Sequence, residues 1–131
     1  MTAVESSIND WVQVKQNGLA ESTKEYLIRA ANVDPKIEIC GFITNGGSVI
    51  PITNVDADPV RGYRMDSDEM VLALTRHEVA GIYHSHPSGR HWPSATDGEQ
   101  MAYWYQQGCD WDYYIVTCND VYRYEHKNRK R

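Results

Sequence analysis

The chain has 131 residues, of which 41% are hydrophobic and 24% charged, and its formal net charge is −5. This length allows one domain with a real core and is too short for two, and the composition is that of a globular rather than a disordered protein. No apolar run approaches the roughly 18 residues of a membrane span, and the N-terminus lacks the basic-then-apolar pattern of a secretion signal. We therefore expect a cytoplasmic protein with no membrane partner.

Charge is distributed unevenly. From Arg123 to Arg131 there are five Lys or Arg and one Glu, a local charge of +4, whereas the rest of the chain carries 8 basic and 17 acidic residues, a charge of −9. A basic tail over 126–131 is open to nucleic acid or an acidic partner, but a solvated terminus is the simpler interpretation. Because the body is acidic, we do not expect nucleic acid as the main ligand.

The three cysteines are odd in number and form no Cys-x-x-Cys pair. They indicate neither a disulfide framework nor a cysteine-type zinc knuckle, so we expect Cys40, Cys109 and Cys118 to be small buried residues.

Helices and strands are predicted to alternate in one α/β domain with a mixed, largely antiparallel sheet. The first 20 residues form an N-terminal extension whose apolar residues fit either a helical turn or a strand. Helices are predicted from Glu21 to Asp34-Pro35, near 68–76, and from Ser94 or Thr96 to Gly108; Ser22 or Thr23 would cap the first. Strands are predicted over 37–43, 49–52, 63–65, 79–84, 112–117 and 121–124, and Asn45-Gly46-Gly47 joins the first two in a hairpin.

Two imidazoles and a carboxylate lie within a short stretch of the chain. His84 and His86 are one residue apart, so on a strand their side chains point the same way and can grip one ion. Asp97 returns to the same point if the turn at 87–89 and the break at Pro93 reverse the chain. Two imidazoles and one carboxylate, with one position open, form the ligand set of a catalytic zinc that holds a water. The pattern predicts zinc as the cofactor.

Two further residues fit such a site. Glu38 would face solvent if Ile37 and Ile39 face the core, but a zinc-bound water needs a carboxylate to take its proton and later protonate a leaving amine. Ser94 is either an N-cap or a hydrogen-bond donor to an oxyanion, and both suit a helix N-terminus, which favours negative charge.

Together, Glu38, His84-Ser85-His86-Pro87 and Pro93-Ser94-Ala95-Thr96-Asp97 resemble the motif of the JAMM (MPN+) zinc metalloproteases. That motif is a glutamate, a later His-x-His-Pro, and a Ser-x-x-Asp whose aspartate follows ten intervening residues, here 87–96. The start of the first sheet strand, with Glu38 and Gly41, also resembles the Glu-x-x-Gly signature of the family. The resemblance covers residues 21–125.

The resemblance implies a cytidine-deaminase-like fold, with zinc bound by His84, His86 and Asp97, Glu38 as general acid and base, and Ser94 as oxyanion stabiliser. It also implies hydrolysis of a peptide or isopeptide bond in a protein or peptide substrate, such as a ubiquitin-like protein. Lacking long insertions, the chain is most similar to compact members from prokaryotes and phages, which indicates the cytoplasm of a bacterium or phage-infected host cell. Two alternatives stay open: a non-enzymatic subunit of an assembly such as a phage tail, its zinc structural, and a RadC-like protein acting on nucleic acid.

Overall fold

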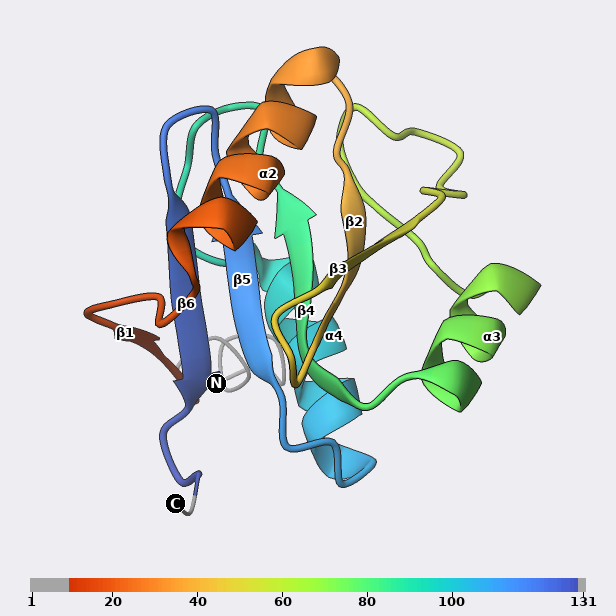
Figure 1. Cartoon of the computed structure of the whole chain (residues 1–131), viewed down its shortest axis with the longest axis vertical. Helices are drawn as coiled ribbons and strands as arrows, with labels where there is room; N and C mark the ends of the chain where they lie inside the picture. The colour runs from red at the N-terminus through yellow and green to blue at the C-terminus, as the bar shows by residue number, and fades with distance from the viewer. Residues whose placement is uncertain (1–9, 130–131) are drawn as a thin grey trace.

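Six strands form one mixed sheet in the computed structural model, which describes residues 10–129 (Figure 1). Across the sheet the order is β1-β6-β5-β4-β2-β3. The strands are β1 (Trp11–Val14), β2 (Cys40–Thr44), β3 (Val49–Ile52), β4 (Val79–Ser85), β5 (Asp112–Val116) and β6 (Val121–His126). Only the β4–β5 pairing is parallel; the other four described pairings are antiparallel. The predicted α/β fold with a largely antiparallel sheet is confirmed.

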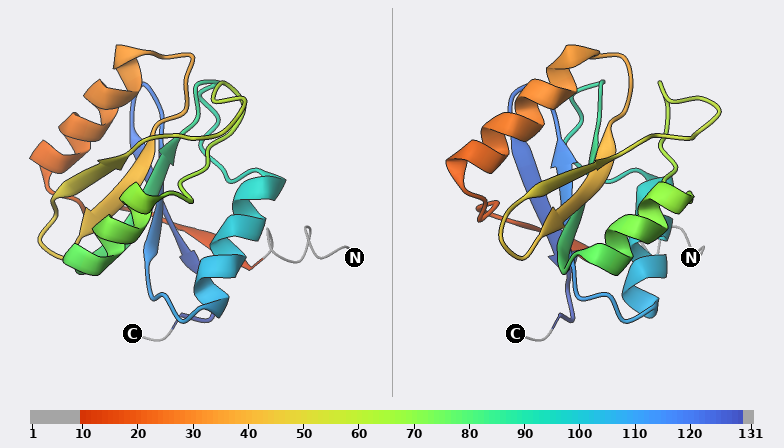
Figure 2. Two further views of the ribbon diagram at one scale, coloured as in Figure 1. Left: turned by 90° about the vertical axis from the view of Figure 1, so that its right-hand side faces the viewer. Right: turned by 45° about the vertical axis from the view of Figure 1, so that its right-hand side comes forward.

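Helices cover both faces of the sheet. Helix α2 (Glu21–Val33) lies on one face, and α3 (Asp68–Arg76) and α4 (Ala95–Gln106) lie on the other (Figure 2). Because side chains alternate along a strand, Tyr113 packs in the core shared with α3 and α4, whereas Tyr114 packs in the core shared with α2. None of the described helices is long and apolar enough to cross a membrane.

Helix α2 and β3 follow the predicted pattern, with one local difference. Leu27 and Ala31, one turn apart, are buried against the sheet, and Asp34 before Pro35 ends the helix. The predicted cap by Ser22 or Thr23 is wrong: Ala20 occupies the N-cap position and makes no side-chain cap. The Thr23 hydroxyl instead donates to the carbonyl of Gly47 at 2.9 Å, which ties α2 to the hairpin turn.

Two predicted strands differ in the structure. The strand expected over 37–43 begins at Cys40, because the Glu38 N–H donates to the carbonyl of Pro59 at 2.8 Å rather than to a neighbouring strand. Residues 63–65 form no strand; the Arg64 N–H donates to the side chain of Asn54 at 3.1 Å. Both differences come from the loop that follows β3, whose backbone and side chains bind these residues outside the sheet.

Both ends of the described chain join the sheet edge. Strand β1, which the sequence left open between helix and strand, pairs with β6. Beyond β6 the described part of the tail, up to residue 129, is not simply solvated, because Arg129 pairs with Asp110 at 2.8 Å and with Asp112; residues 130 and 131 lie outside the described residues. Only Cys40 of the three cysteines is buried, so that expectation is wrong for Cys109 and Cys118, which are half-buried.

Candidate metal centre

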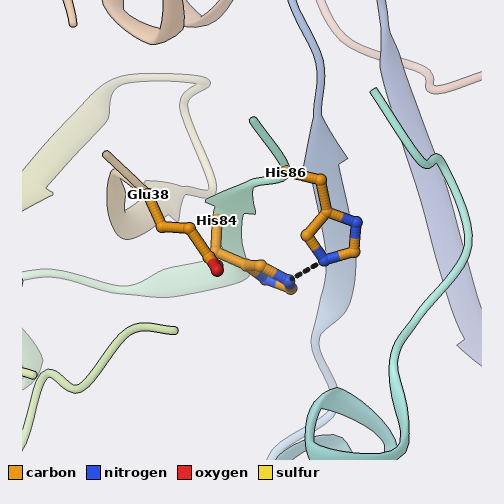
Figure 3. A group of neighbouring side chains, drawn as sticks. All are labelled: Glu38, His84 and His86. Atoms are coloured by element: carbon orange, nitrogen blue, oxygen red, sulfur yellow. Dashed lines mark hydrogen bonds between the residues drawn. The ribbon is translucent and has the colours of Figure 1, made fainter. Parts of the chain in front are cut away.

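The two histidines project from the end of β4. His84 is the sixth residue of the strand, and His86 follows the last one, where its N–H donates to the carbonyl of Val116 at 2.9 Å and continues the pairing with β5. Both side chains are buried. Figure 3 shows the two rings meeting at this end of the sheet, with the Glu38 carboxylate beside them. The two-residue spacing therefore brings the imidazoles together, as predicted from the strand period.

Asp97 completes a tight triangle of ligand atoms. His84 Nε2 lies 3.1 Å from His86 Nε2, and Asp97 Oδ2 lies 3.1 Å from the first nitrogen and 2.9 Å from the second. Asp97 is buried in the first turn of α4, so the turn after His86 does reverse the chain as expected.

The hydrogen-bond partners of His86 indicate that a cation belongs in this triangle. His86 Nδ1 lies 2.7 Å from the carbonyl of Arg90, and since a carbonyl only accepts, Nδ1 carries the proton. In a neutral ring the lone pair is then on Nε2, which faces the acceptor oxygen of Asp97. Two acceptors this close need a positive charge between them, either a proton or a metal ion. An imidazole that donates its other N–H to a backbone carbonyl is the usual arrangement of a metal-binding histidine.

The donor set fits zinc in size as well as in type. Zinc bonds of about 2.0–2.2 Å to nitrogen and oxygen place tetrahedral ligand atoms about 3.3–3.6 Å apart. The three distances between the ligand atoms, 2.9–3.1 Å, are a few tenths of an ångström shorter, so small side-chain movements would admit the ion. A wider group of Glu38, His84 and His86 has ligand atoms within 4.8 Å of one another. The closer triangle makes Asp97 the better third ligand and leaves Glu38 beside the site.

Asp97 is held by the helix that carries it. Ser94 and Asp97 form a capping box: the Ser94 hydroxyl accepts from the Asp97 N–H at 3.1 Å, and Asp97 Oδ2 accepts from the Ser94 N–H at 2.9 Å. Burial raises the pKa of Asp97, but the charge of His84 and hydrogen bonds from His84, His86 and the Ser94 amide outweigh it and hold the pKa below its ordinary range. The carboxylate is therefore charged and fixed.

Glu38 is buried beside the triangle, two residues before β2. The Glu38 backbone carbonyl accepts from the Asn54 side chain at 2.9 Å, and the next residue, Ile39, donates its N–H to the Ser85 hydroxyl at 2.8 Å. Burial raises the pKa of the Glu38 carboxyl, although His84 and His86 lower it. Such a group is suited to carrying a proton.

Tyr63 is a site residue that the sequence did not indicate. Its ring stacks on the His84 ring, with centroids 4.5 Å apart and planes 17° from parallel. It comes from the loop after β3, and nothing in the local pattern of this loop predicts contact with a histidine some twenty residues later. A cavity of about 300 Å³ adjoins the site; among its lining residues are Glu38, His86, Ser94 and Asp97.

Comparisons with known proteins agree with this geometry. Residues 20–128 match the family model of prokaryotic homologs of the JAB domain. A desampylase of Haloferax volcanii is 36% identical over 81 residues, which cover 53% of this chain and 58% of that protein. A probable TtuB-protein conjugate cleaving protease of Thermus thermophilus is 36% identical over 87 residues, covering 61% of this chain and 57% of that protein. The matches thus span little more than half the length of either relative.

Proposed function

Because this chain belongs to the family of prokaryotic JAB-domain proteins, we propose that it is a zinc-dependent peptidase or isopeptidase of the JAMM type. The observation that carries the proposal is the triangle of His84, His86 and Asp97 with Glu38 buried beside it. The names of the relatives support hydrolysis of a bond in a protein conjugate, because one is a conjugate cleaving protease. We propose a protein or peptide substrate, with a conjugated ubiquitin-like protein as the first candidate, and residues 21–125 as the catalytic domain.

Each site residue has a separate task in the proposed reaction. A zinc ion held by His84, His86 and Asp97 would supply a Lewis acid and would lower the pKa of a bound water. Glu38 takes a proton from the attacking water and passes it to the departing amine. The Ser94 hydroxyl accepts its capping bond from Asp97 and still has a proton to donate, and it stabilises the oxygen of the attacked carbonyl.

Two observations favour an enzyme over the alternatives. A structural zinc site is closed by four protein ligands, whereas the cavity here gives a substrate access to Glu38 and the triangle. For nucleic acid, the basic C-terminal segment would have to be free, but Arg123 lies 3.9 Å from Asp112, and Arg129 is bound by Asp110 and Asp112. The described part of that segment is thus partly neutralised.

The proposal is tested with Glu38→Gln. A glutamine keeps the size of the side chain but cannot carry a proton, so we expect zinc content to be unchanged and turnover of an isopeptide-linked conjugate to fall by at least about 100-fold. The measurement pairs metal analysis with cleavage assays on the zinc-loaded protein. Full activity of Glu38→Gln would rule out this residue as the base.

The ligand assignment is tested separately with His86→Ala. Removal of one imidazole leaves two ligands, so we expect the variant to lose both zinc and activity. His77→Ala is the matched control, because His77 is an exposed histidine at the end of α3. Unchanged zinc occupancy in His86→Ala would contradict the assignment.

A further inference from the structure

Two side chains that the proposed reaction does not use line the same cavity as Glu38 and Asp97: Arg90 and Gln100. Arg90 lies in the loop between β4 and α4, four residues after His86, and its carbonyl fixes the His86 ring. Gln100 lies on α4, three residues after Asp97, so the two share one face of the helix. Both residues thus lie within one helical turn or one short loop of a residue of the triangle.

Each of these side chains has a buried polar atom with no partner among residues 10–129. The atoms are Arg90 Nε, a donor, and Gln100 Oε1, an acceptor. A buried polar group without a hydrogen bond costs free energy, and most such groups in proteins are satisfied. Two of them beside one candidate active site indicate a ligand that satisfies both.

The pair has the chemistry of a peptide group. A peptide group presents one carbonyl acceptor and one N–H donor. The Nε–H of Arg90 matches the carbonyl, and Oε1 of Gln100 matches the N–H. A carboxylate would accept from Arg90 but has no proton to donate to the Gln100 oxygen.

We propose that Arg90 and Gln100 bind a substrate peptide group next to the cleaved bond and so position the chain in front of Glu38. This inference rests on the proposed function, because it takes the substrate to be a polypeptide cleaved at this site. It assigns the two residues to binding rather than to the chemical step. They should therefore affect KM more than kcat.

The kinetic test uses Arg90→Ala and Gln100→Ala on the zinc-loaded protein, with an isopeptide-linked conjugate as the substrate. Loss of one hydrogen bond predicts a rise in KM of about tenfold for each variant, with kcat of Gln100→Ala within about twofold. Arg29→Ala on α2 and Gln106→Ala at the end of α4 are controls with the same chemistry at exposed positions, and we expect no change in either. Cleavage with an unchanged KM in both site variants would overturn the inference and leave the proposed function standing.

A binding test separates the two proposals. The probe is acetyl-tetraglycine joined to the ε-amine of lysine, together with ester analogues in which one glycine N–H at a time is replaced by oxygen. One of these esters should bind to Glu38→Gln more weakly than the amide probe does. Adding Gln100→Ala to this variant should abolish the difference in affinity between the amide and that ester. Arg90→Ala should weaken binding of the amide probe. If the wild-type protein cleaves nothing but these binding effects appear, the proposed function fails, and what stands of the inference is that Arg90 and Gln100 bind a peptide group. Absence of binding, or equal binding of amide and every ester, overturns the inference.

Discussion

Glu38 has only 6% of its surface exposed, and this burial raises the pKa of its carboxyl above the ordinary value of 4.5, against the opposing effect of His84 and His86. In the window between 4.5 and the folded pKa, the native protein binds more protons than the unfolded chain. Stability therefore falls as the pH rises through this window, and above the folded pKa the full loss is present. In the metal-free protein, Glu38 thus opposes folding at neutral pH.

A glutamine at position 38 is neutral in both states and lacks this effect. We expect metal-free Glu38→Gln to be more stable than metal-free wild type at pH 7, and the difference to shrink at pH 4, where Glu38 is mostly protonated in both the folded and the unfolded state. Urea unfolding of both proteins at the two pH values measures it. A difference as large at pH 4 as at pH 7 would contradict the proposed origin.

Ser94 has a structural role and a proposed chemical role, which two substitutions separate. Alanine removes both the cap and the hydroxyl, whereas glycine is tolerated at an N-cap with a loss of only a few tenths of a kcal/mol. We expect Ser94→Ala to lower the free energy of unfolding by about 1 kcal/mol and Ser94→Gly to lower it less. Because neither keeps the hydroxyl, kcat should fall about 100-fold in both. If kcat instead falls in proportion to the loss of unfolding free energy, Ser94 acts only as an N-cap.

At the scale of elements, the contacts that were predictable are those set by local periodicity and turn chemistry. The spacing of His84 and His86 predicts convergence on any strand, and α4 begins where Ser94 and Asp97 form their capping box. The strand predicted around Glu38 starts three residues too early, because the Glu38 N–H donates to the carbonyl of Pro59, far along the chain. The local sequence pattern around Glu38 does not predict such a contact.

The same limit applies to the lining of the cavity. Tyr63 stacks on His84 in a loop that Asn54 holds in place. The Asn54 side chain donates to the backbone carbonyls of Glu38 and Gly62. Arg90 and Gln100 belong to no sequence motif. They stand out because each has a buried side-chain atom without a hydrogen-bond partner, which can be seen only in the folded chain. The proximity of His84, His86 and Asp97 was thus predictable from the sequence, whereas the surroundings that would select a substrate were not.

For the molecule as a whole, the proposed metal centre lies where separate parts of the fold meet. His84 and His86 come from the end of β4 and Asp97 from the start of α4, so a bound ion would link the sheet to the helix layer. Without an ion, the two elements are joined here by the close contacts of Asp97 with His84 and His86. Metal binding should therefore act on global stability as well as on catalysis, because a ligand that binds only the native state shifts the folding equilibrium.

Thermal unfolding with and without zinc measures this linkage. At a free zinc concentration a thousandfold above Kd, binding adds about 4 kcal/mol, which corresponds to a rise in Tm of roughly 10–20 °C for a chain of this size. We expect that rise in wild type, in Glu38→Gln and in His77→Ala, and none in His86→Ala. A chelator should reverse it. Equal zinc-dependent shifts in wild type and His86→Ala would mean that the ion binds elsewhere, since removal of one ligand of the triangle must weaken the site.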